Sequence, residues 1–185
     1  SGSTVTANGG SGEDGSGGRG ITSNGGVTVS GGTVNAKGGN GGDGNYSDGG
    51  SGISSNGSLA ISGGTVTAKG GSGEDGSGGR GIISTKSVTI SGGTVEANGG
   101  NGNSGGGSGI YSSVIDLSGS LELTAKAGSP NGKALSQKGS ELVLDTIKDK
   151  LGPGAKVTAT DADGKVIDQV STPRPVDRKS TRLNS

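Results

Sequence analysis

A short apolar alternation that returns about every 29 residues is the feature that most restricts how this chain can fold. Valine or leucine lies at the centre of each GGTVTA-type run, and successive copies are 29, 32, 29 and 28 residues apart. The copies are Val5, Val34, Val66, Val95 and Leu123. Repeats of about 20 to 50 residues cannot bury their apolar faces alone, so they stack into solenoids.

Two further runs recur in every cycle, which gives each cycle three short apolar segments. Apolar residues alternate with Thr, Ser, Asp or Glu in each run, which is the period of a strand with one buried face. The second run repeats Ile21, Ile53, Ile82 and Ile110, with Leu135 as its fifth copy, and the third run extends from Val27 and Val29 to Leu142 and Leu144. We therefore predict an all-β fold, a single-stranded parallel β-helix (β-solenoid) of about five coils of roughly 29 residues.

Composition agrees with a narrow tube rather than a thick globular core. Only 24% of the residues are apolar, and Phe, Trp and Met are absent. An alanine follows each first-run valine two positions later, which predicts a second, slimmer interior column. The Ser-Gly-Gly corners between the third and first runs predict glycine at positive φ, because a sharp turn needs that conformation.

A glycine-rich loop follows each first run. The phrase GGSGEDGSGGRGI occurs identically at 9–21 and 70–82, which indicates duplication of a two-coil unit. We expect these loops to be mobile, because they contain few side chains that could be buried. We also expect Glu13 with Arg19, and Glu74 with Arg80, to form solvated ion pairs of little energetic weight.

The pattern drifts beyond Ser118 and predicts a terminal cap. We place the solenoid at 1–145 and the cap, a short helical turn and a β-hairpin with a DADG turn, at 146–170, where it covers an open sheet edge. The tail occupies 171–185. Its last nine residues, DRKSTRLNS at 177–185, resemble the translation of a sequencing adapter, and we interpret them as an artefact at the end of a fragment.

Charge and residue content exclude several classes of function. Sixteen basic and sixteen acidic residues cancel, and no basic block indicates nucleic acid as a partner. No apolar run is long enough for membrane insertion of this fragment. The chain has no His and no Cys, so we predict that it is not an enzyme. A lyase-type or hydrolase-type β-helix is a weaker alternative, for which Asp43, Asp48, Lys37 and Lys69 are the candidate residues.

Polar residues at the ends of the first runs are the candidate binding residues. Asn and Lys recur there and can hydrogen-bond sugar hydroxyls or uronate carboxylates along an extended polysaccharide. We name Asn8, Lys37, Lys69 and Asn98, followed by Lys126, with Tyr46 as the aromatic candidate for sugar stacking.

Three loops match GGxGxD, which resembles the first six positions of the GGxGxDxUx calcium repeat of β-roll proteins. The resemblance implies Asp14, Asp43 and Asp75 as oxygen ligands for calcium. The fourth loop departs from the pattern, because Ser104 stands in the aspartate position. A calcium-stabilised repeat is therefore the alternative hypothesis, and no other cofactor is expected.

The phrases VTISGGTVEANGG and ISGGTVTAKGGSGEDGSGGRGI resemble the glycine-rich ISGGTVTA repeats of large surface or secreted proteins of Gram-positive bacteria. Some proteins with these repeats are described as carbohydrate-binding β-helix modules. The resemblance implies an extracellular or cell-surface location and an adhesin-like role. We predict a non-enzymatic structural or adhesive module whose partner is a polysaccharide, either a host glycan or a cell-wall glycan.

Overall fold

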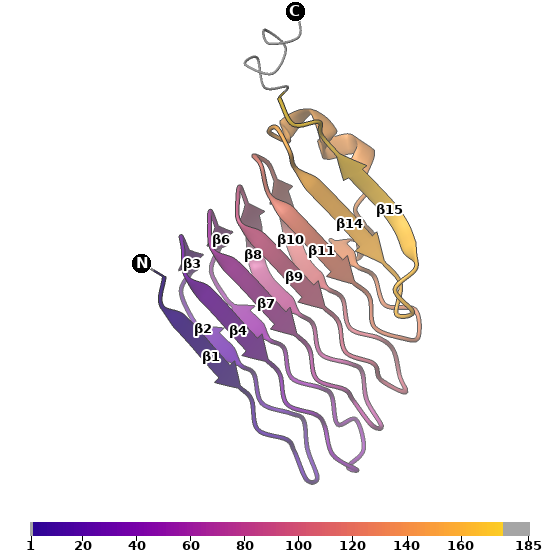
Figure 1. Cartoon of the computed structure of the whole chain (residues 1–185). Coiled ribbons are helices and arrows are strands. Elements are labelled where there is room, and N and C mark those ends of the chain that lie inside the picture. The colour runs from indigo at the N-terminus through magenta and orange to yellow at the C-terminus, as the bar shows by residue number, and fades with distance from the viewer. Residues whose placement is uncertain (1, 176–185) are drawn as a thin grey trace, which may run out of the picture.

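The computed structural model describes residues 2–175, which form an elongated stack of β-strand coils (Figure 1). The coils succeed one another along one axis, and each contributes strands to two sheets. Equivalent strands of neighbouring coils pair in parallel, so the predicted all-β solenoid of about 29 residues per coil is confirmed. The segment interpreted as an artefact, 177–185, lies outside the described residues.

The first sheet consists of the GGTV-type runs. Its strands pair in register, so that Val5 lies opposite Val34, Val34 opposite Val66, and Val66 opposite Val95. The predicted valine column is therefore confirmed. In spatial order the strands are β1 (Thr4–Asn8), β4 (Thr33–Lys37), β7 (Thr65–Lys69), β9 (Thr94–Asn98), β11 (Glu122–Lys126), β14 (Lys156–Thr160) and β15 (Val166–Ser171).

The second sheet combines the other two runs and confirms the isoleucine column, which ends with Ile110 opposite Leu135. β8 and β10 each merge a second and a third run into one strand. The sheet contains β2 (Ile21–Ser23), β5 (Ile53–Ser55), β8 (Ile82–Ile90), β10 (Ile110–Leu117), β12 (Leu135–Gln137) and β13 (Ser140–Glu141), with β3 (Val27–Val29) and β6 (Leu59–Ile61) beside them.

Burial of the core depends on having a coil on each side. Val66 in the third coil is fully buried, whereas Val5 at the open end of the stack is 49% exposed. The alanine column is also confirmed, since Ala36, Ala68 and Ala97 pair in register and are buried. Aliphatic columns between two sheets therefore make up the interior, and their small side chains explain its narrow section.

The predicted Ser-Gly-Gly corners are confirmed. The second glycine of each corner has a positive φ, with values of 76°, 81° and 80° at Gly32, Gly64 and Gly93. Glycine adopts this conformation without a Cβ clash.

The C-terminal end differs from the expected pattern in two ways. The fifth copy of the third run forms no parallel strand, because Lys138 and Gly139 both have positive φ and turn β13 back antiparallel to β12. Leu142 and Leu144 are nevertheless buried. The chain then forms a 3-10 helix, η1 (Leu144–Lys150), and β14 adds a sixth parallel strand to the first sheet before β15 closes the hairpin.

The glycine-rich loops are ordered layers, so the expectation that they are mobile was wrong. They extend side by side from the strand ends (Figure 1) and are hydrogen-bonded from coil to coil. The expectation considered only side-chain burial, whereas backbone groups hold these loops together.

Candidate functional site

Each loop consists of an outgoing leg that leaves the first sheet and a return leg that enters the second. In the first coil we define these legs as 9–12 and 17–20. The Gly12 N–H donates to Asn40 O of the next outgoing leg at 2.9 Å, and the Gly20 N–H donates to Ser51 O of the next return leg at 3.0 Å. Outgoing legs therefore stack on outgoing legs and return legs on return legs, as equivalent strands do in the sheets.

A second set of hydrogen bonds joins the two kinds of leg. The Gly39 N–H donates to Gly18 O, and the Gly50 N–H donates to Gly39 O, each at 2.8 Å. These bonds continue as one zigzag along the stack through Gly10, Gly18, Gly39, Gly50, Gly71, Gly79, Gly100, Gly107 and Gly128. Within three successive residues of a leg, one N–H binds the next coil, one binds the opposite leg, and the third residue is directed outward. A period of three residues is typical of polyproline II-like chains.

Close approach of backbones explains why these legs are glycine. A Cβ at Gly39 would lie 2.1 Å from Gly10 O, and a Cβ at Gly50 would lie 2.0 Å from Gly18 O. Neither residue has a φ in the left-handed region. Space, rather than conformational freedom, therefore demands glycine, and the GGxG part of the proposed calcium motif has a packing explanation.

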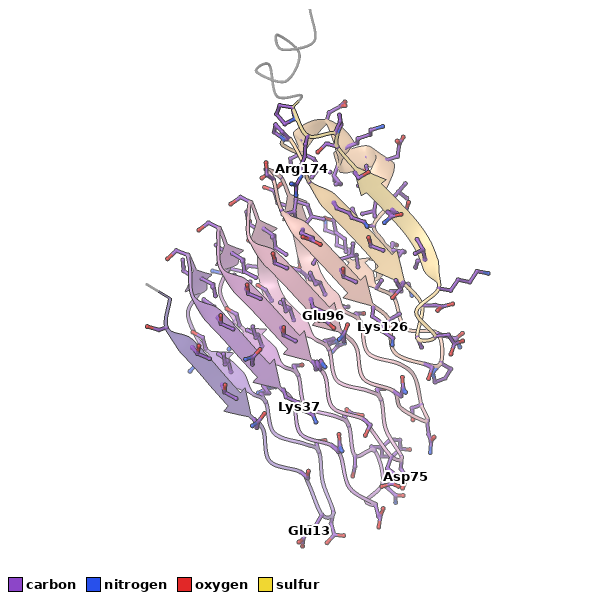
Figure 2. The ribbon with its side chains drawn as sticks, in the orientation of Figure 1. Glu13, Lys37, Asp75, Glu96, Lys126 and Arg174 are labelled. Atoms are coloured by element: carbon purple, nitrogen blue, oxygen red, sulfur yellow. The ribbon has the colours of Figure 1, made fainter. Side chains whose placement is uncertain are left out.

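The structure aligns the four predicted Asn and Lys residues into one row on the outer face of the first sheet. Asn8 pairs in register with Lys37, Lys37 with Lys69, and Lys69 with Asn98. We call these residues, continued by Lys126 on β11, the strand-end row. Successive members lie about 4.8 Å apart, the spacing of neighbouring strands. Figure 2 shows Lys37 where its strand passes into a loop.

A carboxylate modifies the strand-end row, whereas the aromatic candidate lies away from it. The Asn98 Nδ2 donates to Glu96 Oε1 at 2.9 Å, so a carboxylate lies beside the fourth position. Tyr46 is not part of the row. It lies in the tip of the second loop with a φ of 62° and is 84% exposed.

Asp14, Asp43 and Asp75 are exposed at the loop tips, where Figure 2 shows Glu13 and Asp75. A hydrogen bond with Asp43 and the negative charge of Asp43 raise the pKa of Glu74, with smaller contributions from desolvation and Asp75. No three acidic side chains of residues 2–175 form a group that could hold a metal ion. Asp14, Asp43 and Asp75 therefore do not come together as one ligand group among the described residues, and the calcium hypothesis stays a prediction.

The two expected ion pairs do not form. In the described part of the chain the salt bridge joins Lys150 to Asp116, while Glu74 contacts Asp43 of the preceding coil. The Arg80 guanidinium lies 4.6 Å from the centroid of the Tyr111 ring. The observed partners come from different coils that stack on one another, whereas the expected ion pairs were chosen because their residues are close in the sequence.

An open groove of about 660 Å³ crosses five coils along the return legs. Its outward positions include Arg19, Arg80 and Lys133, with Tyr111 beside them. Sequence reasoning missed this groove. A signal for it was present in the sequence. The residue two positions before each second-run aliphatic residue alternates between a cation and serine from one repeat to the next.

The four residues named for an enzymatic alternative are not assembled. Asp48 lines the groove and accepts the Ser77 N–H at 2.7 Å, whereas Lys37 and Lys69 do not line it. Asp43 lies at a loop tip beside Glu74. Between residues 2 and 175, no helix is long and apolar enough to cross a membrane. No family model, curated protein or solved structure matches this chain.

Proposed function

We propose that this chain is a non-enzymatic structural and adhesive repeat module of a secreted or cell-surface bacterial protein, and that it binds polysaccharide. The in-register strand-end row is the observation that supports binding most directly. A flat face with one amide or ammonium group every ~4.8 Å offers repeated hydrogen-bond donors to a repeating ligand.

The chemistry of the row favours hydroxyl-rich chains. Asn donates and accepts hydrogen bonds, and Lys donates three, so both side chains can bind sugar hydroxyls. Glu96 accepts hydrogen bonds and repels nearby anions, which disfavours a densely charged ligand at this face. The absence of His and Cys from the sequence supports a binding role rather than catalysis.

A glycan array tests the proposal. We expect the wild-type chain to bind extended polysaccharides and the Asn8→Ala, Lys37→Ala, Lys69→Ala, Asn98→Ala variant to lose that signal. A matched control is Thr33→Ser with Thr65→Ser, which alters the same exposed face but not the row. Equal signals from the wild-type chain and the fourfold variant, with both folded by circular dichroism, would refute a role for the row.

A further inference from the structure

The groove contains a second row of polar residues that alternates with the coils. The residues Arg19, Ser51, Arg80, Ser108 and Lys133 occupy equivalent outward positions of five return legs. Backbone bonds fix their order, since the Gly20 N–H donates to Ser51 O and the Gly52 N–H donates to Arg80 O, each at 3.0 Å. We call these five residues the return-leg row.

A cation occurs at every second coil of this row. Because one coil step is about 4.8 Å, Arg19, Arg80 and Lys133 are spaced about 9.6 Å apart along the stack. Serine occupies the coils between them. Ser51 and Ser108 are each only 9% exposed. The groove therefore alternates one long cationic side chain with one short hydroxyl side chain.

The backbone adds a donor at every coil. The N–H groups of Arg19, Ser51, Arg80, Ser108 and Lys133 make no hydrogen bond to other described residues. In the first four return legs, the other N–H groups of each triplet are directed to the next coil and to the opposite leg. Because the legs have a three-residue period, the remaining N–H is directed outward.

The charge balance of the groove favours an anionic ligand. Asp48 is the one carboxylate among its lining residues, and its Oδ1 already accepts the Ser77 N–H. The Tyr111 ring lies 4.6 Å from the Arg80 guanidinium, an arrangement that orients the cation. The groove thus presents three cations, together with hydroxyls and outward N–H groups, and only one acidic side chain.

We propose that the groove binds a linear polysaccharide with one acidic group per disaccharide, in which acidic and neutral sugars alternate. Two coils are comparable in length to one disaccharide, so each acidic group meets a cation and each neutral sugar meets a serine. This site shares no residue with the strand-end row and does not depend on it.

Isothermal titration calorimetry of the whole chain tests the proposal with three hexasaccharides. One alternates glucuronate and N-acetylglucosamine, one contains galacturonate at every ring, and one is neutral β-1,4-glucan. We expect the alternating ligand to bind most tightly. Changing Arg19, Arg80 and Lys133 to Ser, which the chain itself has at Ser51 and Ser108, should weaken its binding by about ten- to hundredfold.

The matched control changes Lys86, Lys148 and Lys165 to Asn, which removes the same net charge from exposed positions outside both the groove and the strand-end row. It should leave the affinity of the alternating ligand within about twofold. Equal weakening by both triple variants would overturn the proposal, because it would indicate a nonspecific charge effect. Equal or tighter binding of the galacturonate or neutral ligand, or no binding of the alternating one, would also overturn it.

A single substitution provides an independent readout that does not require the triple variant to fold. Asp48→Asn removes the one carboxylate of the groove and can still accept the Ser77 N–H. We expect it to strengthen binding of the alternating ligand severalfold and to leave the neutral ligand unaffected. An unchanged or weaker affinity for the alternating ligand would contradict an anion-binding groove. Failure of the strand-end row on the glycan array would leave these outcomes unchanged.

Discussion

Replacing Gly71 by alanine tests whether stacking of the glycine legs holds the loops together. Gly71 is buried in the outgoing leg of the third coil, and an added Cβ would lie 2.0 Å from Gly39 O and 2.5 Å from Gly39 C. Both obstacles are backbone atoms. Gly10 occupies the equivalent position in the first described coil, and a Cβ there meets nothing within 4 Å. The two substitutions differ mainly in whether a neighbouring coil is present.

The expected cost follows from the hydrogen bonds that the clash breaks. Real Cβ contacts stay beyond 3.0 Å, so the legs must separate by about 1 Å at Gly71. This movement stretches the Gly71 N–H to Gly50 O bond and the Gly79 N–H to Gly71 O bond, both now 2.8 Å. Overpacking costs about 1–3 kcal/mol and each unpaired buried group about 1–3 kcal/mol. Alanine returns only about 0.4–1 kcal/mol by restricting the unfolded chain.

We therefore expect Gly71→Ala to lower the free energy of unfolding by about 3–5 kcal/mol and Gly10→Ala to change it by less than about 1 kcal/mol. Urea unfolding followed by far-ultraviolet circular dichroism measures both values, with the m-value as a check on two-state behaviour. Equal losses would show that conformational freedom, rather than space, requires glycine. No loss from either substitution would show that the legs do not stack.

Three further predictions concern the buried hydroxyl of Ser112, the carboxyl group of Glu141 and the role of calcium. Ser112→Ala should raise stability by about 1 kcal/mol, because its buried hydroxyl has no partner within residues 2–175, whereas Ser84→Ala should lower it by a similar amount because the Ser84 Oγ donates to Gly57 O. The reverse order in urea unfolding would contradict this. Burial raises the pKa of Glu141 above 4.5, so the stability this residue contributes is present at low pH and lost as the pH rises through its folded pKa. The melting temperature of the wild type should therefore fall relative to that of Glu141→Gln as the pH rises beyond 4.5, and a constant difference would count against this effect. Excess chelator should leave the melting temperature unchanged, since backbone bonds hold the loops; a decrease that calcium restores, and that Asp43→Asn abolishes, would instead support the calcium-stabilised repeat.

Strand columns were predictable from the sequence because their information lies in side chains. The alternation of apolar and polar residues around Val34 and Ala36 predicts which face of the strand is buried. The length of the repeat predicts which strand of the next coil pairs with it. The end of the solenoid was harder to predict. Lys138 adopts a positive φ next to Gly139, and this local turn overrides the apolar pattern at Leu142.

Order in the loops could not be predicted from side-chain patterns, since glycine has no side chain to alternate. The relevant regularity is a period of three, in which two residues are glycine and the third is free to vary. It becomes interpretable only once the coil stack places a carbonyl such as Gly10 O where a Cβ at Gly39 would lie. The strand-end row was visible in the sequence because strands set its register, whereas the return-leg row required that stack.

The same packing limits where this protein can vary its surface chemistry. Within the stacked legs, glycines such as Gly39 and Gly50 have no room for a Cβ, and their N–H groups are used in the zigzag. The third residue of each return-leg triplet takes no part in the zigzag, so a side chain there does not break those backbone bonds. On the return legs these positions hold Arg, Ser or Lys. A scaffold built on glycine legs therefore confines surface variation to one residue per leg and coil, and the alternation from Arg19 to Lys133 is the pattern that we propose binds the acidic polysaccharide.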